Sequence, residues 1–270
     1  MNLEEYKNYL SLNIDAKNTQ KNYLRVATQF FANFPTFNQQ NFDNFLLKKL
    51  EEGVSKNTFN LYMFALKKYS AFSKVEITCP KQKKSGKTER AYLTEQELFE
   101  ELFPYFQRLF KNYEFVMFVF KLFFYTGLRP CELVNLKTED IFLKDCYFVI
   151  RNPKDKDDRK IPFPKELLLN VELYKQKEGS AFKITYLQLK YYFDKINNYL
   201  NYKKKLTPYS LRNSFAYYCI EKGMPLDRLQ LLMGHADIQT TMIYAKPSEK
   251  QAIDCYYDMV KIYKPKKGKK

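Results

Sequence analysis

Apolar residues in the first part of the chain recur every three or four positions, a spacing that places them on one face of a helix. This pattern predicts four short helices within residues 1–76. One helix begins at Asn18 and carries an apolar face made by Tyr23, Val26, Phe30 and Phe34. The last helix follows Gly53, and its apolar face is made by Phe59, Met63, Leu66 and Tyr69 or Ser70. Its opposite face holds Lys56, Asn57, Asn60, Lys67 and Lys68. That basic face is expected either to contact DNA phosphates or to be exposed to solvent.

A second helical region begins near residue 94. Thr94 and Glu97 have the spacing of a capping box, which predicts the start of a helix. The apolar run from Phe115 to Tyr125 is interrupted by Lys121 and is shorter than the ~20 residues that cross a bilayer. We therefore expect a buried helix that ends at Gly127. Its expected core residues are Phe118, Phe120, Phe123 and Phe124.

The hydrophobic period changes between residues 138 and 164. Three short strands are predicted at residues 141–143, 146–150 and 159–163. Lys144-Asp145 is expected to form the first turn, and the charged segment 152–158 a longer second one. The pattern is helical again from there to about residue 263. The predicted fold class is therefore mainly α with a small antiparallel β-sheet.

Changes in composition indicate where the domains meet. Residues 77–92 are polar and basic and lack periodicity, which is typical of a linker. We expect one helical domain at residues 1–76 and a second domain at residues 93–263. Residues 264–270 form a basic tail that is expected to be disordered.

The charge balance indicates the kind of partner. A formal net charge of +16 favours a polyanion, with nucleic acid ahead of an anionic membrane surface. The first residues lack the basic and apolar regions of a signal peptide, so we expect a cytoplasmic protein. The five cysteines are dispersed, without a C-x-x-C pair, and are expected to be free thiols, with Cys131 buried. With a single histidine they do not make a zinc site.

Four side chains of the second domain suit chemistry on a phosphodiester. Arg129 and Arg212 supply charge, His235 a hydrogen-bond partner and Tyr244 a possible oxygen nucleophile. The sequence places no cluster of metal ligands near them. It therefore predicts metal-free chemistry without a cofactor.

Local signals place these residues at the ends of helices. Thr207-Pro208 predicts a helix start that brings Tyr209 and Arg212 onto one face of the first turn. Free backbone N–H groups at such an end favour a phosphate. Gly234 is predicted to end the preceding helix as a left-handed cap, just before His235.

These residues lie in three blocks that resemble the tyrosine recombinase (phage integrase) family. The first block is 126–133, followed by Leu136 and Asp140. The second is 209–216, and the third is 231–238, running on to Thr240, Thr241 and Tyr244. The resemblance covers most of residues 93–246 and identifies them as a catalytic domain. The N-terminal helices resemble the SAM-like, core DNA-binding domain of the family.

The resemblance implies a role for each residue. Tyr244 attacks the scissile phosphate and forms a 3′-phosphotyrosine, while Arg129 and Arg212 bind the non-bridging oxygens. His235 donates a hydrogen bond to the phosphate or steadies its neighbours. Lys154 protonates the leaving 5′-oxygen as general acid, with Lys156 as the alternative.

The same resemblance implies a structural role for two acidic residues. Glu132 and Asp140 are expected to brace the first arginine and its helix rather than to react.

The chain departs from the family at one site position. The family commonly has a histidine three residues before the second arginine, and Tyr209 stands there instead. A phenol binds a phosphate oxygen but is a poor general base at neutral pH, because its ordinary pKa is ~10. Water or the substrate phosphate are then the candidates to accept the proton of Tyr244.

The resemblance also implies partners. Two domains would clamp duplex DNA, two protomers would bind inverted half-sites, and two such dimers would form a tetramer that exchanges strands through a Holliday junction. The last helix carries an apolar stripe that is expected to dock into a neighbouring protomer, although packing on its own domain is the alternative. The stripe consists of Ile253, Tyr256, Tyr257, Val260 and Ile262.

Several functional assignments share these features. A Xer-like resolvase of replicon dimers or a mobile-element recombinase fits best, partly because no insertion separates Arg212 from His235 as it does in integron integrases. A type IB topoisomerase shares the chemistry, and a non-catalytic DNA-binding protein shares the charge without needing Tyr244. A telomere-hairpin-forming resolvase is a remoter alternative.

Overall fold

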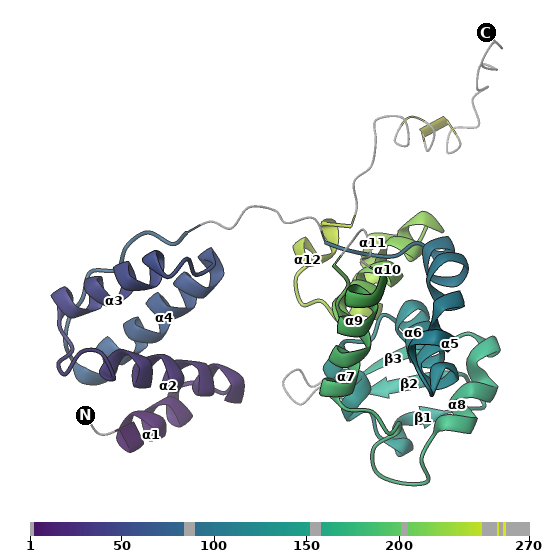
Figure 1. Cartoon of the computed structure of the whole chain (residues 1–270), viewed down its shortest axis with the longest axis horizontal. Coiled ribbons are helices and arrows are strands. Elements are labelled where there is room, and N and C mark those ends of the chain that lie inside the picture. Colours follow the sequence, from purple (N-terminus) through teal and green to yellow (C-terminus); the bar gives the residue numbers. More distant parts are fainter. Residues whose placement is uncertain are drawn as a thin grey trace. The chain divides into compact units, whose positions relative to one another are not determined.

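The computed structural model describes residues 3–83, 90–151, 158–200, 205–244, 253 and 256–257. The chain divides into two compact units, Met1–Glu89 and Arg90–Lys270 (Figure 1). Each unit has its own core of buried apolar side chains, so each is described by itself.

The first unit contains the four predicted helices, and their number is confirmed for the described residues of this unit. They are α1 (Leu3–Asn13), α2 (Lys17–Phe31), α3 (Gln39–Glu51) and α4 (Lys56–Ser73). Asn38 and Ser55 cap α3 and α4, because each side chain accepts a backbone N–H of the first turn. The buried faces meet in a core that includes Val26, Phe30 and Phe45.

One residue of the expected basic face of α4 is buried. Lys56 and Lys67 are exposed as predicted, but Asn60 is only 6% exposed. Its amide donates to the carbonyl of Lys83 at 2.9 Å and accepts from the N–H of Lys83 at 3.0 Å. The backbone that follows the helix therefore covers this position, and the amide satisfies the hydrogen bonds of that backbone.

The second unit begins with the capping box expected at Thr94. The backbone N–H of Thr94 donates to Glu97 Oε2 at 2.8 Å, and the N–H of Glu97 donates to Thr94 Oγ1 at 3.1 Å. The helix that follows is not continuous. It consists of η1 (Glu97–Leu102), η2 (Phe103–Tyr105) and α5 (Phe106–Leu109), because Pro104 lacks the N–H that a regular helix needs.

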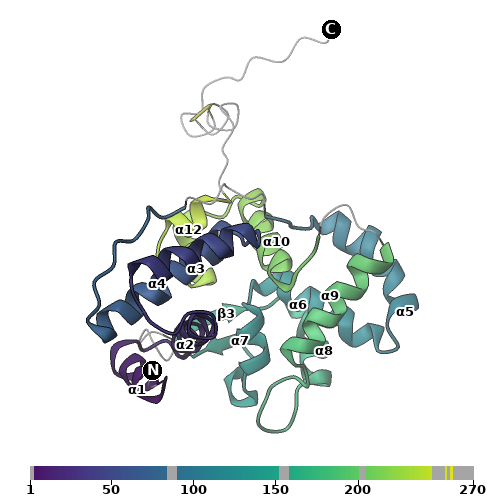
Figure 2. The ribbon, with the colours of Figure 1, turned by 60° about the vertical axis from the view of Figure 1, so that its left-hand side comes forward.

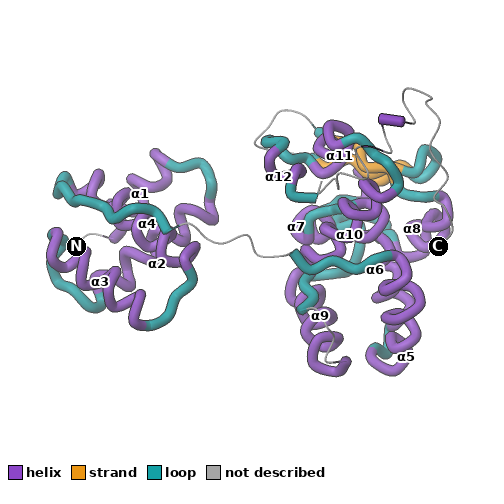
Figure 3. Tube along the Cα trace, turned by 90° about the horizontal axis from the view of Figure 1, so that it is seen from above, coloured by secondary structure: helices purple, strands orange, loops and turns teal. Residues whose placement is uncertain are grey.

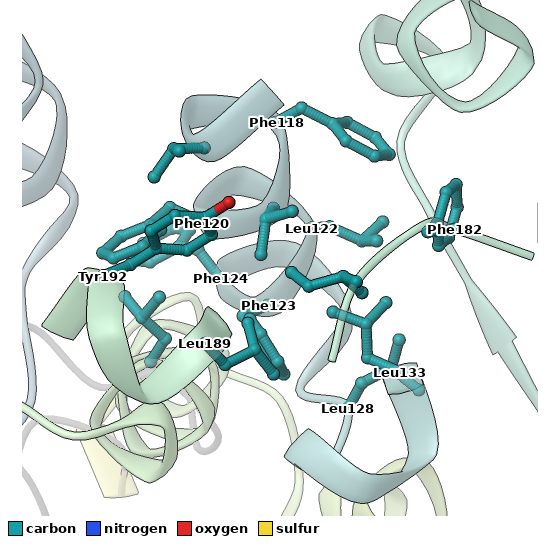
Figure 4. Close-up of a cluster of buried hydrophobic side chains, with 14 of the residues drawn as sticks. Phe118, Phe120, Leu122, Phe123, Phe124, Leu128, Leu133, Phe182, Leu189 and Tyr192 are labelled. Atoms are coloured by element: carbon teal, nitrogen blue, oxygen red, sulfur yellow. The ribbon is translucent and has the colours of Figure 1, made fainter. Parts of the chain in front are cut away.

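The apolar run forms α6 (Tyr113–Thr126), which ends at Gly127 in the left-handed conformation. All four phenylalanines predicted for the core are buried (Figure 4). Phe120, for example, stacks on Phe193 with ring centroids 4.7 Å apart. The end of α6 coincides with the start of the first sequence block.

The three predicted strands are present as one antiparallel sheet in the order β1-β2-β3. They are β1 (Ile141–Phe142), β2 (Tyr147–Ile150) and β3 (Arg159–Pro162). Ile141 pairs with Phe148, and Phe148 with Ile161, so the apolar positions share the buried face. The first turn is longer than expected and spans residues 143–146. Of the second turn, residues 152–157 lie outside the described residues.

Helices make up most of the remaining chain, which confirms a mainly α fold with a small antiparallel sheet. They are α7 (Pro130–Asn135), η3 (Thr138–Asp140), η4 (Lys165–Leu167), α8 (Leu168–Tyr174), α9 (Tyr186–Leu200), α10 (Pro208–Glu221), α11 (Leu226–Met233) and α12 (Gln239–Met242). Helix α10 packs against α6 (Figure 2) and α11 against β3 (Figure 3). Helix α10 also packs against α11, and its contacts with α6 and α11 bring the three sequence blocks together.

Two further expectations concern single features. Cys131 is exposed rather than buried, because it lies at the outer side of the short helix α7. The other described cysteines, Cys79, Cys146 and Cys219, are also free thiols. Among the described residues, none of the helices combines the length and apolarity needed to cross a bilayer.

Candidate active site

A single carboxylate lies at the centre of the site. Glu132, in the first turn of α7, accepts the Arg129 backbone N–H at 2.7 Å and Arg129 Nη1 at 2.6 Å. Burial alone raises the pKa of this carboxyl, but hydrogen bonds and charge from Arg159 and then from Arg129 outweigh burial and lower it. The expected bracing of Arg129 by Glu132 is therefore confirmed.

Arg159, which the sequence analysis did not single out, contributes a third arginine. Its Nη1 and Nη2 atoms bind the two oxygens of Glu132 at 3.0 and 2.7 Å, and its Nε donates to the carbonyl of Leu232 at 3.0 Å. A signal was available in the sequence, because Arg159 lies two residues from buried Ile161 on the same face of β3. Strand alternation therefore points its side chain inward.

Arg212 is buried at the start of α10, with 4% of its surface exposed. Its Nη1 donates to the carbonyl of Gly127 at 2.6 Å and its Nη2 to the carbonyl of Met233 at 2.5 Å. Burial, followed by the charge of Arg129, lowers its pKa to about 10, so it stays cationic at neutral pH. The bonds to Gly127 and Met233 join the second block to the first and the third.

His235 follows the left-handed cap that Gly234 forms, as predicted. Its Nε2 lies 3.1 Å from Arg212 Nη2, and its Nδ1 lies 2.8 Å from Thr241 Oγ1. Burial, followed by the charges of Arg212 and Arg129, lowers its pKa to about 4. The ring is therefore neutral at pH 7, with Nε2 accepting from the arginine and Nδ1–H donating to the threonine.

Two glycines allow these segments to approach closely. Gly127 has φ +60°, and a Cβ there would lie 2.2 Å from the ring of Phe215. Gly234 also has φ +60°, and a Cβ there would lie 2.7 Å from Arg159 Nη1. The carbonyl of Gly234 accepts Arg129 Nη2 at 2.6 Å. Both positions favour glycine on conformational and on steric grounds.

Tyr244 follows α12 and is buried, with 3% of its surface exposed. Its hydroxyl donates to Asn213 Oδ1 at 2.9 Å, and Arg90 Nη1 lies 3.3 Å from the same oxygen. The sequence analysis missed both partners. Asn213 directly follows Arg212 in α10, so its nearness to the site could have been expected, whereas nothing in the sequence marks Arg90.

Tyr209 and Arg212, three residues apart at the start of α10, differ in burial. Tyr209 is 49% exposed, whereas Arg212 points inward to the carbonyls of Gly127 and Met233. Partial burial, followed by the charge of Cys131, raises the pKa of the Tyr209 phenol. The phenol therefore remains protonated at neutral pH.

Asp140 does not brace Arg129. It accepts Arg151 Nε at 2.9 Å, and Arg151 Nη1 binds Asp158 Oδ2 at 2.6 Å. These ion pairs join the two described ends of the second hairpin, because Arg151 and Asp158 flank it. Both candidate general acids, Lys154 and Lys156, lie outside the described residues.

The local charge suits an anion. Arg90, Arg129, Arg159 and Arg212 are all near His235, and Glu132 is the carboxylate shared by Arg129, Arg159 and Arg212. A cavity of about 530 Å³ lies beside this cluster and beside the ends of the second hairpin. Within the described part of the chain, no three His, Cys, Asp or Glu side chains gather as metal ligands.

Comparison with known proteins decides the family. Residues 92–251, more than half of the chain, match the model of the Phage integrase family. Tyrosine recombinase XerA of Pyrococcus horikoshii is 31% identical over 267 residues, covering 92% of this chain and 90% of that protein. This chain is a tyrosine recombinase of the phage integrase family. XerA of Pyrococcus furiosus is 32% identical over 269 residues, with the same coverage.

Solved structures share the fold of this tyrosine recombinase. A crystal structure of XerA recombinase has a TM-score of 0.50 at 20% identity, and covers 97% of this chain and 99% of that one. The Tn1549 transposon integrase in complex with transposon right-end DNA has a TM-score of 0.72 at 17% identity, and covers 96% and 99%. At these identities the likeness shows the fold alone.

The lowered pKa of His235 predicts how the stability of the recombinase depends on pH. In the unfolded chain this histidine takes up a proton near its ordinary pKa of 6.5, but in the folded chain only near pH 4. Stability is therefore full above about pH 6.5 and falls as the pH is lowered toward about 4. The slope cannot exceed about 1.4 kcal/mol per pH unit, because one histidine takes up at most one proton.

Urea unfolding between about pH 5 and 6.5 measures this slope, because no other side-chain type has its ordinary pKa in that window and His235 is the only histidine. We expect the urea midpoint of the wild type to fall with pH and that of His235→Asn to change much less. Equal slopes for the two proteins would contradict a neutral, half-buried His235.

Proposed function

We propose that this tyrosine recombinase cuts and rejoins duplex DNA at specific sites through a 3′-phosphotyrosine at Tyr244. The observation that carries this proposal is the convergence of Arg129, Arg212 and His235, which come from three sequence blocks. The carbonyls of Gly127, Met233 and Gly234 fix the two arginines in place. The bond energy of the phosphodiester is kept in the covalent intermediate, so the reaction needs no nucleotide.

Arg129 and Arg212 are proposed to bind the non-bridging oxygens of the scissile phosphate. Planar guanidinium groups match the geometry of these oxygens and stabilise the negative charge of the transition state. The Arg129 side chain is 30% exposed, so it meets the DNA first. Arg212 is buried, and its charge acts in surroundings that screen it less than water does.

His235 is proposed to hold Arg212 rather than to transfer a proton. In its neutral form both ring nitrogens are already used, one by Arg212 and the other by Thr241. Tyr209 stands where the family commonly has a histidine, and its protonated phenol suits a hydrogen bond to a phosphate oxygen. The proton of Tyr244 then passes to water or to the substrate phosphate.

Both units are proposed to bind DNA. The first unit presents Lys56 and Lys67 on the exposed face of α4. The whole chain has a formal net charge of +16, which suits contact with many phosphates. Affinity that rests on phosphate contacts falls steeply with salt.

The likeness to XerA over nearly the whole chain supports a Xer-like role, such as resolution of replicon dimers in the cytoplasm. Integration or excision of a mobile element is the second possibility, because the Tn1549 integrase shares the fold at the higher TM-score of 0.72. One solved neighbour, XerH, is described as bound to its difH substrate. Sequencing of captured DNA ends would distinguish the two roles, because a replicon-resolution site and an element end have different surroundings.

The first prediction of this proposal concerns the nucleophile. Wild-type protein mixed with sheared DNA in EDTA should give a covalent protein–DNA adduct after denaturation, and Tyr244→Phe should give none. Tyr217→Phe is the matched control, because the ring of Tyr217 lies 5.4 Å from that of Tyr244. This variant should still form the adduct.

Specific outcomes would favour the other assignments. An adduct formed without site preference would favour a type IB topoisomerase. If nicked substrates that carry a selected binding site also gave no adduct, the chain would be a DNA-binding protein without this chemistry.

The second prediction concerns the general acid. Lys154→Ala should slow cleavage by on the order of 10²-fold, because the leaving 5′-oxygen would lack its proton donor. Lys156→Ala should change the rate much less. A substrate with sulfur at the 5′-bridging position leaves without a proton and should restore the Lys154→Ala rate. Restoration of Lys156→Ala alone would assign the role to Lys156.

We also propose a homo-oligomer in which the last helix of one protomer docks on another. Ile253 and Tyr256 are helical and exposed, at 46% and 54%. The second unit has a cavity of about 510 Å³ that suits such apolar side chains. The cavity is lined mainly by Tyr125, Ile161, Phe163, Phe215, Tyr218, Met224 and Leu232.

The third prediction tests this docking. Two protomers should bind cooperatively to a duplex with two inverted selected sites, and pairs of such complexes should give a tetramer in light scattering. Ile253→Asp should weaken the cooperativity at least about tenfold, because burial of the isoleucine is lost. Leu12→Asp is the control, since Leu12 is 88% exposed in the first unit. Unchanged cooperativity in Ile253→Asp would place the helix on its own domain.

A further inference from the structure

The hydroxyl of Tyr244 has both of its hydrogen-bonding functions occupied. It donates its proton to Asn213 Oδ1 at 2.9 Å, and it accepts from Arg90 Nη1 at 3.3 Å. The Arg90 guanidinium carbon also lies 5.9 Å from the centre of the Tyr244 ring. The side chain is 3% exposed. A phosphate therefore has no access to this hydroxyl in the observed arrangement.

The orientation of the Asn213 amide is fixed by a second bond. Its Nδ2 donates to the carbonyl of Ala91 at 3.1 Å, so Oδ1 is the atom that faces the tyrosine. An amide oxygen accepts a hydrogen bond but does not take up the proton. Arg90 only donates. In this arrangement the hydroxyl proton faces an amide oxygen that cannot remove it, whereas attack on phosphorus requires loss of that proton.

Residues 90–93 form one continuous contact with α10 and Tyr244. Beside the bonds of Arg90 and Ala91, the ring of Tyr92 stacks on Tyr217 with centroids 3.9 Å apart. The backbone N–H of Leu93 donates to Ser214 Oγ at 2.8 Å. This segment is the first part of the second unit and follows directly on the unit that ends at Glu89. A shift of the segment breaks the bonds to Asn213 and to Tyr244 together.

We propose that Asn213 and Arg90 are positioning residues that hold Tyr244 in an inaccessible resting position until segment 90–93 moves. The idea rests on the proposed function, because it takes Tyr244 as the nucleophile. Asn213 is then not part of the reacting set. Its removal accelerates release of the tyrosine instead of abolishing cleavage.

Acetylation of the free protein tests the resting position without DNA. N-acetylimidazole modifies accessible phenols, and the tryptic peptide 229–250 contains Tyr244 as its only tyrosine, so mass spectrometry follows this one site. Asn213→Ala should raise the rate of Tyr244 acetylation by about two- to tenfold, the range that loss of a neutral hydrogen bond gives. Arg90→Ala, at an exposed position that is safe for folding, should raise it as well.

Asn197→Ala is the matched control for general loosening. Asn197 lies in α9 of the same unit, and its amide makes two bonds to the backbone of Leu206, at 2.8 and 2.9 Å. It has no part in the contacts of Tyr244. The proposal is overturned if Asn197→Ala accelerates acetylation as much as Asn213→Ala does, or if neither Asn213→Ala nor Arg90→Ala accelerates it.

Cleavage of a nicked substrate with a selected binding site is the second readout. At saturating DNA, Asn213→Ala should form the adduct about two- to tenfold faster than wild type, with unchanged DNA affinity. A slower rate would show that Asn213 serves the reaction and would overturn the proposal. Faster acetylation with no adduct from any variant would support the contact of Tyr244 with Asn213 and Arg90. It would at the same time count against DNA cleavage by Tyr244.

Discussion

The second unit depends on the ion pairs that Glu132 makes. This carboxylate binds Arg129 from the start of α7 and Arg159 from β3, and it lies 3.9 Å from Arg212 of α10. Without it, three guanidinium groups would repel one another in a partly buried space, at a cost that grows as water is excluded. With it, their remaining N–H groups are free to bind backbone carbonyls. The carboxylate therefore fixes the distance between cations that a phosphate has to meet.

The backbone carbonyls of the third block complete this arrangement. Leu232, Met233 and Gly234 offer consecutive carbonyl oxygens, which accept from Arg159, Arg212 and Arg129 respectively. Such carbonyls at the end of a helix lack partners within the helix, so they are available to charged donors. The end of α11 thus orients the arginines, and His235 adds a neutral acceptor for the most buried of them. The positive charge is held in place before any substrate arrives, which is the condition for electrostatic stabilisation of a transition state.

Sequence patterns predicted the helices, strands and caps of this fold better than the side-chain contacts between different elements. The capping box at Thr94, the end of α6 at Gly127 and the cap at Gly234 depend on neighbours a few residues away, and all three are present. Burial of Asn60 depends on backbone 23 residues further along, which periodicity does not report. The predicted partner of Asp140 was wrong for the same reason. Arg151, its actual partner, comes near Asp140 only through the register of the sheet. The three blocks located Arg129, Arg212, His235 and Tyr244 and one residue that holds them, Glu132, but Arg159 and Arg90 come from outside the blocks and Asn213 from an unmarked position within one.

The conformation of Gly234 limits how this recombinase can be redesigned. A side chain there meets Nη1 of Arg159. This guanidinium cannot move alone, because its Nη1 and Nη2 each bind an oxygen of Glu132, and displacement of Glu132 reaches Arg129. One added methyl group thus affects three charged residues on two separate segments, β3 and the start of α7. Directed evolution toward a new DNA target has freedom on the exposed side of α4, where a lysine such as Lys67 contacts none of this network. Almost no substitution is tolerated at the turn after α11. Useful libraries should therefore vary the exposed side of α4 and leave this turn unchanged.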